Sequence, residues 1–409
     1  MISISISGGL SGLLFWILSA NIFPPEEVGL ASAIISSMGL ISLLSLFGFD
    51  IVLIRILPAA TQNNERETLI STCFTISLIV SIIFSIIFIL GIQIWSPGLS
   101  ILQTNHYFSA LFVLFCLFQT IAMLQLQGVF IGLRKSEYGL YQSVFSFGRI
   151  ITVLILTFLG TLGIVLSYCF DLITGVCLGL YFLVHKFELP ISPKINKKVI
   201  TEISHFSFGN YIARIFEFLP TYILPIIIVN LVSARDTAFF FIVWTAMSIT
   251  LIFPKSVFTS LLIEGAHDRK SIKINLWKSL ALVGIILFGI IIGVFFVGET
   301  ILSFFGREYG TNGIELLKIL VVAAIPYSVN YLFISLYRIK KEVQPIILTF
   351  FGISSITIFG SLILIPTSGI IGIGYAWMSG NVIVLILSGF YNCHKWNSLL
   401  SGIPHIENE

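Results

Sequence analysis

Charged residues are scarce in this sequence. Asp, Glu, Lys and Arg make up 10% of its 409 residues, whereas a soluble domain carries roughly 25%. Hydrophobic residues account for 57% of the chain, and the mean hydropathy is +1.04. No soluble core uses so much apolar surface, so the composition predicts a membrane protein. The formal net charge of +3 is too small to indicate a nucleic-acid partner.

Signatures of redox, metal or phosphate chemistry are also missing. The five cysteines form no CxxC pair and no cluster with histidine, so we interpret them as small buried hydrophobic residues. The sequence has no phosphate-binding loop and no run of metal ligands, and its histidines lie in loops or near the ends of apolar runs. We therefore expect no enzyme activity, no metal site and no cofactor.

Long apolar runs, by contrast, fill almost the whole chain. A helix needs about 20 apolar residues to cross the hydrocarbon core of a bilayer, and twelve runs reach that length. The fold class we predict is an all-α membrane protein with about twelve transmembrane helices. The predicted spans are 2–22, 28–57, 69–95, 107–133, 138–159, 163–185, 205–230, 237–262, 277–298, 314–338, 343–365 and 369–393. We expect the first to be a retained helix and not a signal peptide, because it has no basic residue before it.

The basic residues between the spans fall on alternate connections. Sixteen of the 22 lysines and arginines lie on the even-numbered connections or the carboxyl-terminal tail, and the opposite connections hold Arg235 and Arg307. By the positive-inside rule, this asymmetry places both termini in the cytoplasm. We therefore predict a multi-pass protein of the cell membrane.

A weak internal repeat relates the two halves of the chain. Residues 26–38 align with residues 235–247 at a shift of 209 positions, and the same shift carries Gly160-x-x-Gly163 onto Gly369-x-x-Gly372. Six spans per half give both halves the same orientation, related by a pseudo-two-fold axis along the membrane normal. The predicted parts are a bundle at 1–185, a cytoplasmic linker at 186–204, a second bundle at 205–395 and a tail at 396–409. We expect this two-bundle arrangement to leave a cleft between the halves.

Charged side chains inside the apolar runs are the strongest functional signal. Each costs at least about 2.5 to 3.5 kcal/mol at the centre of a membrane helix. Five are basic and three are acidic, and an excess of positive charge in a cleft favours an anion. The basic residues are Arg55, Arg149, Arg214, Lys255 and Lys318, and the acidic residues are Asp50, Asp171 and Glu217.

Two interpretations of these charges stay open. Arg214 and Glu217 lie three residues apart on one helical face, so they suit a simple ion pair. Asp50 and Arg55, which share one span, are also candidates to neutralise each other. Alternatively, Arg149 and Arg214 face a water-filled cavity and bind substrate. The three acidic residues are candidates for a proton or sodium site, or for counter-ions. Gln125 and Asn210 suit sugar hydroxyls, or hydrogen bonds between helices.

Three segments resemble a known family. They are FPPEEVGLASAIISSMGLISLLSLFGFDIVLIRILP, LQGVFIGLRKSEYGLYQSVFSFGRI and PTSGIIGIGYAWMSG. Together they resemble the polysaccharide-transporter (Wzx-like) branch of the multidrug/oligosaccharidyl-lipid/polysaccharide exporter superfamily. The resemblance implies two six-helix bundles arranged as a V with a cleft between them. Similar proteins flip oligosaccharides linked to undecaprenyl diphosphate to the outer leaflet, often with an ion gradient. It also implies that Arg55 and other cationic residues of a central cavity contact the substrate's phosphates.

We therefore expect a flippase for a lipid-linked oligosaccharide, such as an O-antigen, capsule or exopolysaccharide unit. Arg55, Arg149, Arg214 and Lys255 would hold the diphosphate, and Gln125 and Asn210 the sugars. Membrane lipids and the polysaccharide biosynthesis machinery are the expected partners. An ion-coupled drug or metabolite antiporter of the same fold is the alternative, although organic cations favour acidic sites. A polysaccharide polymerase or ligase needs a large external loop, and the outer connections near 96–106 and 299–313 are short.

Overall fold

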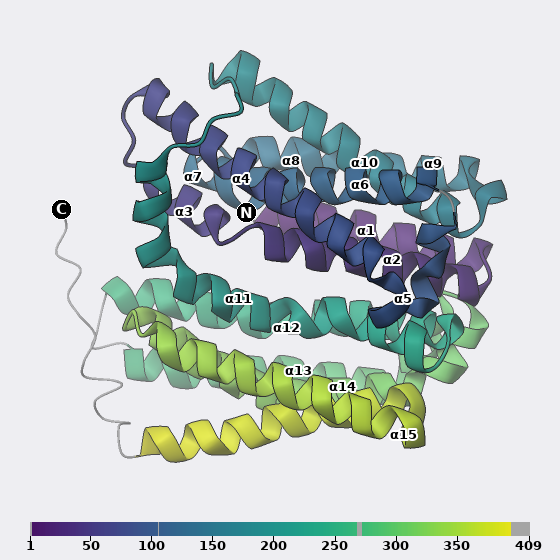
Figure 1. Cartoon of the computed structure of the whole chain (residues 1–409). Coiled ribbons are helices and arrows are strands. Elements are labelled where there is room, and N and C mark those ends of the chain that lie inside the picture. The colour runs from purple at the N-terminus through teal and green to yellow at the C-terminus, as the bar shows by residue number, and fades with distance from the viewer. Residues whose placement is uncertain (1, 105, 268–271, 394–409) are drawn as a thin grey trace. The chain divides into compact units, whose positions relative to one another are not determined.

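Helices make up nearly all of the protein (Figure 1). The computed structural model describes residues 2–104, 106–267 and 272–393, and within these ranges no strand occurs. Apolar runs form helices because a helix satisfies its backbone hydrogen bonds internally, as the bilayer core requires. The predicted tail at 396–409 lies outside the described ranges.

The first part of the chain contains short helices and irregular turns between its longer helices. In order, they are α1 (Ile2–Ile22), α2 (Pro25–Ser45), α3 (Phe49–Ile56), α4 (Asn63–Leu90), α5 (Ile92–Trp95), η1 (Pro97–Gln103), α6 (His106–Leu124), η2 (Gln125–Val129), α7 (Phe130–Gly132), α8 (Ser136–Phe145), α9 (Gly148–Ile155), η3 (Thr157–Leu159), α10 (Thr161–Tyr181) and η4 (Phe182–Lys186). Both η2 and η4 are π-helical turns, whereas η1 and η3 are 3-10 turns.

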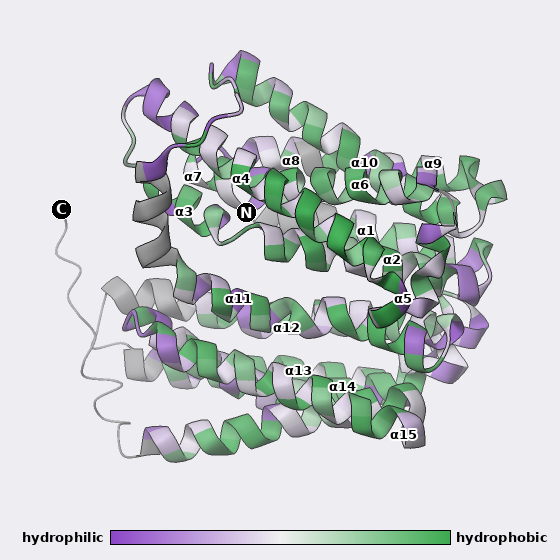
Figure 2. Cartoon of the chain, viewed as in Figure 1, coloured by the Kyte–Doolittle hydropathy of each residue, from purple (hydrophilic) through white to green (hydrophobic). Residues whose placement is uncertain are grey.

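The second part consists of long helices. They are α11 (Lys197–Leu231), α12 (Ala234–His267), α13 (Ile272–Ser303), α14 (Arg307–Ile339) and α15 (Val343–Cys393). Hydrophobic residues run along these helices, and hydrophilic residues gather mostly at their ends and connections (Figure 2).

The observed helices match the predicted spans, with differences in continuity. Among the described residues, nine helices are long and apolar enough to cross a membrane. One of them, α15, covers the last two predicted spans. Its backbone leaves the helical conformation at Gly369, between these two spans. The first predicted span corresponds to α1, of which Gly9–Ile22 forms a shorter apolar helix. The fifth is divided between α8 and α9.

The second predicted span, 28–57, is not one helix. Phe47 and Gly48 have φ angles of 47° and 77°, a left-handed conformation that ends α2 and starts α3 in a new direction. The break places Asp50 in the first turn of α3, where a carboxylate is favoured by the partial positive charge of the helix amino terminus.

The two glycines that the repeat makes equivalent adopt the same backbone conformation. Gly160 has φ 57° and ψ −132°, and Gly369 has φ 55° and ψ −142°. Both occur where an apolar run turns back, and only glycine enters this region without strain. Gly163 and Gly372 also correspond. A Cβ atom on Gly163 would lie 2.1 Å from the backbone oxygen of Leu156, and one on Gly372 would lie 2.8 Å from the backbone of Leu364. The repeat is therefore visible in backbone geometry as well as in sequence.

The amino-terminal turns of α2 and α12 pack together through equivalent positions. Glu26 forms an ion pair with Arg235 at 3.9 Å. A Cβ atom on Gly29 would lie 3.0 Å from the backbone nitrogen of Ala238. The shift of 209 positions aligns Glu26 with Arg235 and Gly29 with Ala238, so these contacts join positions that the repeat makes equivalent.

The chain divides into two compact units. Unit 1 contains residues 1–215 and 221–238, and unit 2 contains residues 216–220 and 239–409. Most of α11 groups with unit 1. The reason is packing: the Tyr211 hydroxyl donates to the backbone oxygen of Leu44 at 2.7 Å, and Gly98 N donates to the Asn230 side chain at 2.8 Å.

The predicted linker is shorter than expected and is docked on α4. Residues 187–196 are non-helical, and α11 already begins at Lys197. Backbone nitrogens of Ser192, Lys194 and Asn196 donate to hydroxyl oxygens of α4 at 3.2 to 3.3 Å. Those acceptors are Ser71, Thr75 and Thr72. The segment is thus held along unit 1 by a row of hydroxyl groups.

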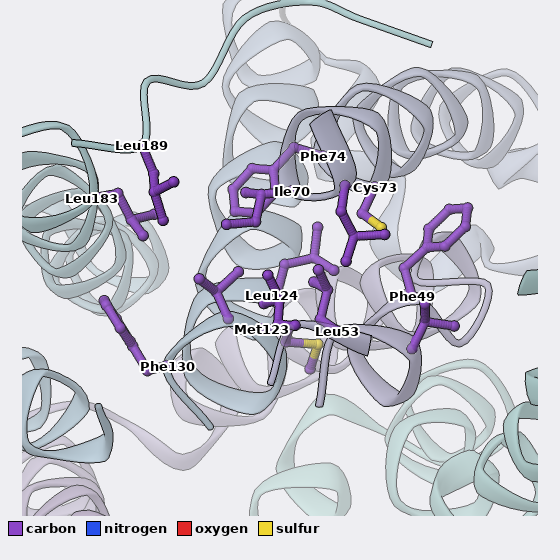
Figure 3. Close-up of a cluster of buried hydrophobic side chains, with 14 of the residues drawn as sticks. Phe49, Leu53, Ile70, Cys73, Phe74, Met123, Leu124, Phe130, Leu183 and Leu189 are labelled. Atoms are coloured by element: carbon purple, nitrogen blue, oxygen red, sulfur yellow. The ribbon is translucent and has the colours of Figure 1, made fainter. Parts of the chain in front are cut away.

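A hydrophobic cluster anchors α3 within unit 1 (Figure 3). Phe49 and Leu53 of α3 pack in a cluster that also contains residues of α4, α6, α7, η4 and the connection to α11. Leu53 is fully buried and Leu189, from that connection, is 2% exposed. Close van der Waals packing of these side chains fixes the helix that carries Asp50.

Candidate functional site

The first intramembrane charge pair joins Arg214 on α11 to Asp50 on α3. A guanidinium nitrogen of Arg214 contacts Oδ2 of Asp50, and the other terminal nitrogen donates to Oε1 of Gln127. The side chain of Asp50 is 1% exposed and that of Arg214 is 20% exposed. The counter-ion of Arg214 is therefore buried, whereas the Arg214 side chain itself remains partly accessible.

A π-helical turn brings Gln127 to this pair. The turn η2 interrupts the helix between α6 and α7, and such bulges occur often at functional sites. Gly128 lies against α3, where a Cβ atom would come within 3.0 Å of the Asp50 Cα. A Cβ atom added at Gly132 would come within 2.4 Å of the Leu53 carbonyl oxygen. The two glycines permit the close approach that lets Gln127 reach Arg214.

The remaining polar candidates of unit 1 differ in how deeply they are buried. Gln125 is fully buried and donates to the Val176 carbonyl at 3.3 Å, and its Oε1 has no hydrogen-bond partner among the described residues. Asn210 is half-buried, one helical turn before Arg214 on α11. Arg55 is exposed in the last turn of α3. Gln125 thus suits helix packing better than sugar binding, whereas Asn210 and Arg55 remain accessible.

The second pair lies between α9 and α10. Arg149 is 3.4 Å from Oδ2 of Asp171, and their side chains are 9% and 14% exposed. Two guanidinium nitrogens of Arg149 donate to the Ser11 hydroxyl at 3.1 and 2.9 Å. The guanidinium carbon also lies 5.5 Å from the centre of the Phe15 ring, within range of a cation–π interaction.

These contacts change the interpretation of Arg149. The sequence predicted that it faces a water-filled cavity, but the structure encloses it with a carboxylate, a hydroxyl and an aromatic ring. Ser11 and Phe15 come from α1, more than a hundred residues away in the chain, so no local spacing indicates them. The arrangement is that of a satisfied buried charge that ties α1, α9 and α10 together.

The third pair belongs to unit 2. Nζ of Lys255 on α12 lies 3.0 Å from Oε1 of Glu217 on α11, and the two side chains are 33% and 14% exposed. Three aromatic rings surround the ammonium group with their centres 5.7 to 5.9 Å away. They belong to Phe218, Tyr327 and Tyr331. We call these three rings and Glu217 the Lys255 cage.

The observed partners differ from those that the sequence suggested. Asp50 pairs with Arg214 on α11, and Glu217 pairs with Lys255 on α12. The expected pairs lie on one helix each, whereas the observed pairs join different helices. The sequence identified the charged residues but missed Ser11, Phe15, Tyr327 and Tyr331, because aromatic and hydroxyl residues are common in apolar helices.

Comparison with known families and structures decides the class of protein. The profile of the family described as "Polysaccharide biosynthesis protein" matches residues 1–261, well over half of the chain. The chain belongs to this family. This agrees with the resemblance noted in the sequence. Among curated proteins, none matches the sequence significantly.

Solved structures share the fold over nearly the full chain. An inward-facing multidrug resistance MATE family transporter of the MOP superfamily is similar, with a TM-score of 0.77, 12% identity, and coverage of 96% of this chain and 95% of the other. The lipid II flippase MurJ in an inward closed conformation has a TM-score of 0.74 and 14% identity, and the likeness covers 96% of this chain and 87% of MurJ. An outward-facing MATE transporter has a TM-score of 0.65 and 12% identity, with coverage of 97% and 95%.

At these identities, the likeness shows the fold alone. The chain is thus a multi-pass membrane protein that shares the fold of these solved structures. The proteins it resembles are transporters and a flippase, and not enzymes.

Proposed function

We propose that the protein moves an oligosaccharide linked to undecaprenyl diphosphate from the cytoplasmic to the outer leaflet by alternating access. Membership of a polysaccharide biosynthesis family supports a glycan substrate. The likeness to a lipid II flippase adds support for a lipid-linked one. In this proposal the protein resides in the plasma (inner) membrane with both termini in the cytoplasm, and works beside the enzymes that assemble the glycan.

The observation that carries the proposal is the accessibility of Arg214. Membrane insertion of an arginine costs several kcal/mol, and a purely structural charge is best enclosed, as Arg149 is. Arg214 is 20% exposed and Lys255 is 33% exposed, so each keeps part of its positive charge available to a phosphate. In unit 1 we assign phosphate contacts to Arg214 and Arg55, and the first sugars to Asn210. In unit 2, Lys255 is a further candidate for a phosphate contact.

The acidic partners supply a route to ion coupling. Asp50 and Glu217 each neutralise a basic residue that we assign to the diphosphate. When a phosphate group binds the basic side chain, the carboxylate loses its counter-ion. It then becomes a better site for a proton or sodium ion. Substrate binding and ion binding would then favour each other at the same residues.

The Lys255 cage favours a second candidate, transport of organic cations. Aromatic rings around a carboxylate are the usual surroundings of a bound alkylammonium group, and the likeness to MATE transporters agrees with this chemistry. In this protein, however, the cage already contains the protein's own ammonium group. We therefore place this candidate second.

Reconstitution of the purified protein in liposomes separates the two candidates. A fluorescent lipid-linked oligosaccharide on the inner leaflet should become accessible to an external glycosidase faster than in protein-free vesicles. Accumulation of an organic cation such as ethidium should stay at the protein-free level. The reverse pattern would favour the antiporter and contradict the flippase.

A further inference from the structure

A groove in unit 2 lies between the end of α14 and the two parts of α15. Its volume is about 550 Å³. The lining includes the buried side chains of Tyr337, Thr349 and Val384. It also includes Leu348 and Leu387, which are 60% and 62% exposed. A buried base with exposed walls is the form of a surface groove that opens towards the surroundings of the helices.

The lining offers little to a polar ligand. The Tyr337 hydroxyl donates to Oδ1 of Asn392 at 2.9 Å, and the Thr349 hydroxyl donates to the Pro345 carbonyl at 2.8 Å. These polar atoms are therefore already used within the protein. The remaining lining combines five aliphatic or proline side chains with Gly352, Gln344, Ser388 and Tyr391. The aliphatic residues are Pro345, Leu348, Ile356, Val384 and Leu387, and they suit a hydrocarbon chain.

The length of the groove matches one leaflet. Its lining on the first part of α15 extends from Gln344 to Ile356, which is about 18 Å at roughly 1.5 Å per helical residue. One leaflet contributes about half of the hydrocarbon core of roughly 30 Å. An acyl chain that enters from one leaflet therefore spans the groove, whereas a much longer polyprenyl chain would extend far beyond it.

Positive charge lies at one end of the groove. Lys340 and Lys341 occupy the turn between α14 and α15, and Gln344, at the end of the groove, follows within one helical turn. Basic residues at the surface of a bilayer attract anionic lipid headgroups. The opposite end, near Ile356, is apolar. The arrangement of charge and aliphatic surface is thus that of a phospholipid, with a charged head and an apolar chain.

We propose that this groove binds one acyl chain of an anionic phospholipid, with the phosphate beside Lys340 and Lys341. A resident lipid would fill the space between the two parts of α15.

Lipid retention in the purified full-length protein tests the inference. The wild type is extracted from membranes in a mild detergent and examined by native mass spectrometry. Three variants are compared with it: Ser388→Trp and Leu387→Trp, which fill the groove from one wall, and Phe390→Trp, a matched change on the same helix. Phe390 is 75% exposed and is not part of the lining. Monodisperse size-exclusion profiles establish that each variant is folded.

The wild type and Phe390→Trp should retain a phospholipid, and the two groove variants should retain about tenfold less, because the indole ring occupies the space of the chain. Replacing Lys340 and Lys341 together by Gln should change the retained lipid from phosphatidylglycerol to phosphatidylethanolamine. Equal retention in all tryptophan variants would overturn the inference. Retention of a polyprenyl phosphate in place of a phospholipid would also overturn it, and would assign the groove to the transported lipid.

Discussion

Arg214 on α11 forms an ion pair with Asp50, which is buried at the start of α3. The two residues come from the seventh and second predicted spans, so the pair ties together segments that are distant in the chain. Gln127 accepts a second hydrogen bond from the same guanidinium group. Arg214 is therefore oriented by two neighbours while part of its side chain remains exposed.

We expect Arg214→Ala to abolish export of the lipid-linked glycan and Arg214→Lys to retain part of it. A diphosphate requires positive charge first and bidentate geometry second. Glycan delivered to the outer leaflet, normalised to protein in the membrane, measures the effect. The double variant Asp50→Ala with Arg214→Ala removes both charges and leaves no unpaired ion. If transport recovers in that double variant, Arg214 only neutralises Asp50 and the phosphate role is wrong.

Arg149 should behave as a structural residue. Replacing Arg149 by Ala leaves Asp171 buried without its partner, a change that typically costs about 3 to 5 kcal/mol. The thermal midpoint of the detergent-purified protein, followed by fluorescence size exclusion, should fall sharply. The double variant Arg149→Met with Asp171→Leu should recover most of the loss. The exposed Arg55→Ala is the control and should leave the midpoint unchanged. An unchanged midpoint in Arg149→Ala would contradict the structural role.

Gly132→Ala should disturb the site through α3. The added methyl group would lie 2.4 Å from the Leu53 carbonyl oxygen, so α7 and α3 must separate and Asp50 must move. Both the thermal midpoint and glycan export should decrease. Gly289→Ala in α13 is the matched control, because its Cβ atom would meet nothing within 4 Å, and alanine improves helix propensity by up to about 1 kcal/mol. Equal midpoints for the two variants would show that α3 tolerates the separation.

Removing Lys255 should open its cage to external cations. In Lys255→Ala, Glu217 and the three aromatic rings lose their internal ammonium group, so ethylammonium should bind and raise the thermal midpoint. The wild type should show no such increase. Adding Glu217→Gln to Lys255→Ala removes the carboxylate and should weaken the effect about tenfold, which is the change expected for a loss of about 1.4 kcal/mol. Equal stabilisation of wild type and Lys255→Ala would refute the cage.

The orientation proposed from basic residues can be checked with reporter insertions. An insertion after Lys194 should report the cytoplasm, and one after Arg307 the opposite side, because positive charge accumulates on cytoplasmic connections. Paired reporters, one active only in the cytoplasm and one only outside it, give the readout. If both positions report the same compartment, the twelve-span arrangement is wrong.

The sequence by itself determined that this is an all-α membrane protein, where its helices lie, and which residues carry charge into the bilayer. Hydropathy fixes these features because the bilayer accepts little else than apolar helices. The turns at Gly160 and Gly369 were also predictable, since few residues other than glycine tolerate their conformation.

Only the tertiary structure decided which charges meet. The sequence suggested pairs of Asp50 with Arg55 and of Arg214 with Glu217, each within one span, but the observed partners of Asp50 and Glu217 lie on other helices. The break at Phe47 and Gly48 and the π-helical turn at Gln125–Val129 were likewise hidden in continuous apolar runs. These features depend on long-range packing between helices, where the partner of a side chain is set by the fold and not by its neighbours in sequence.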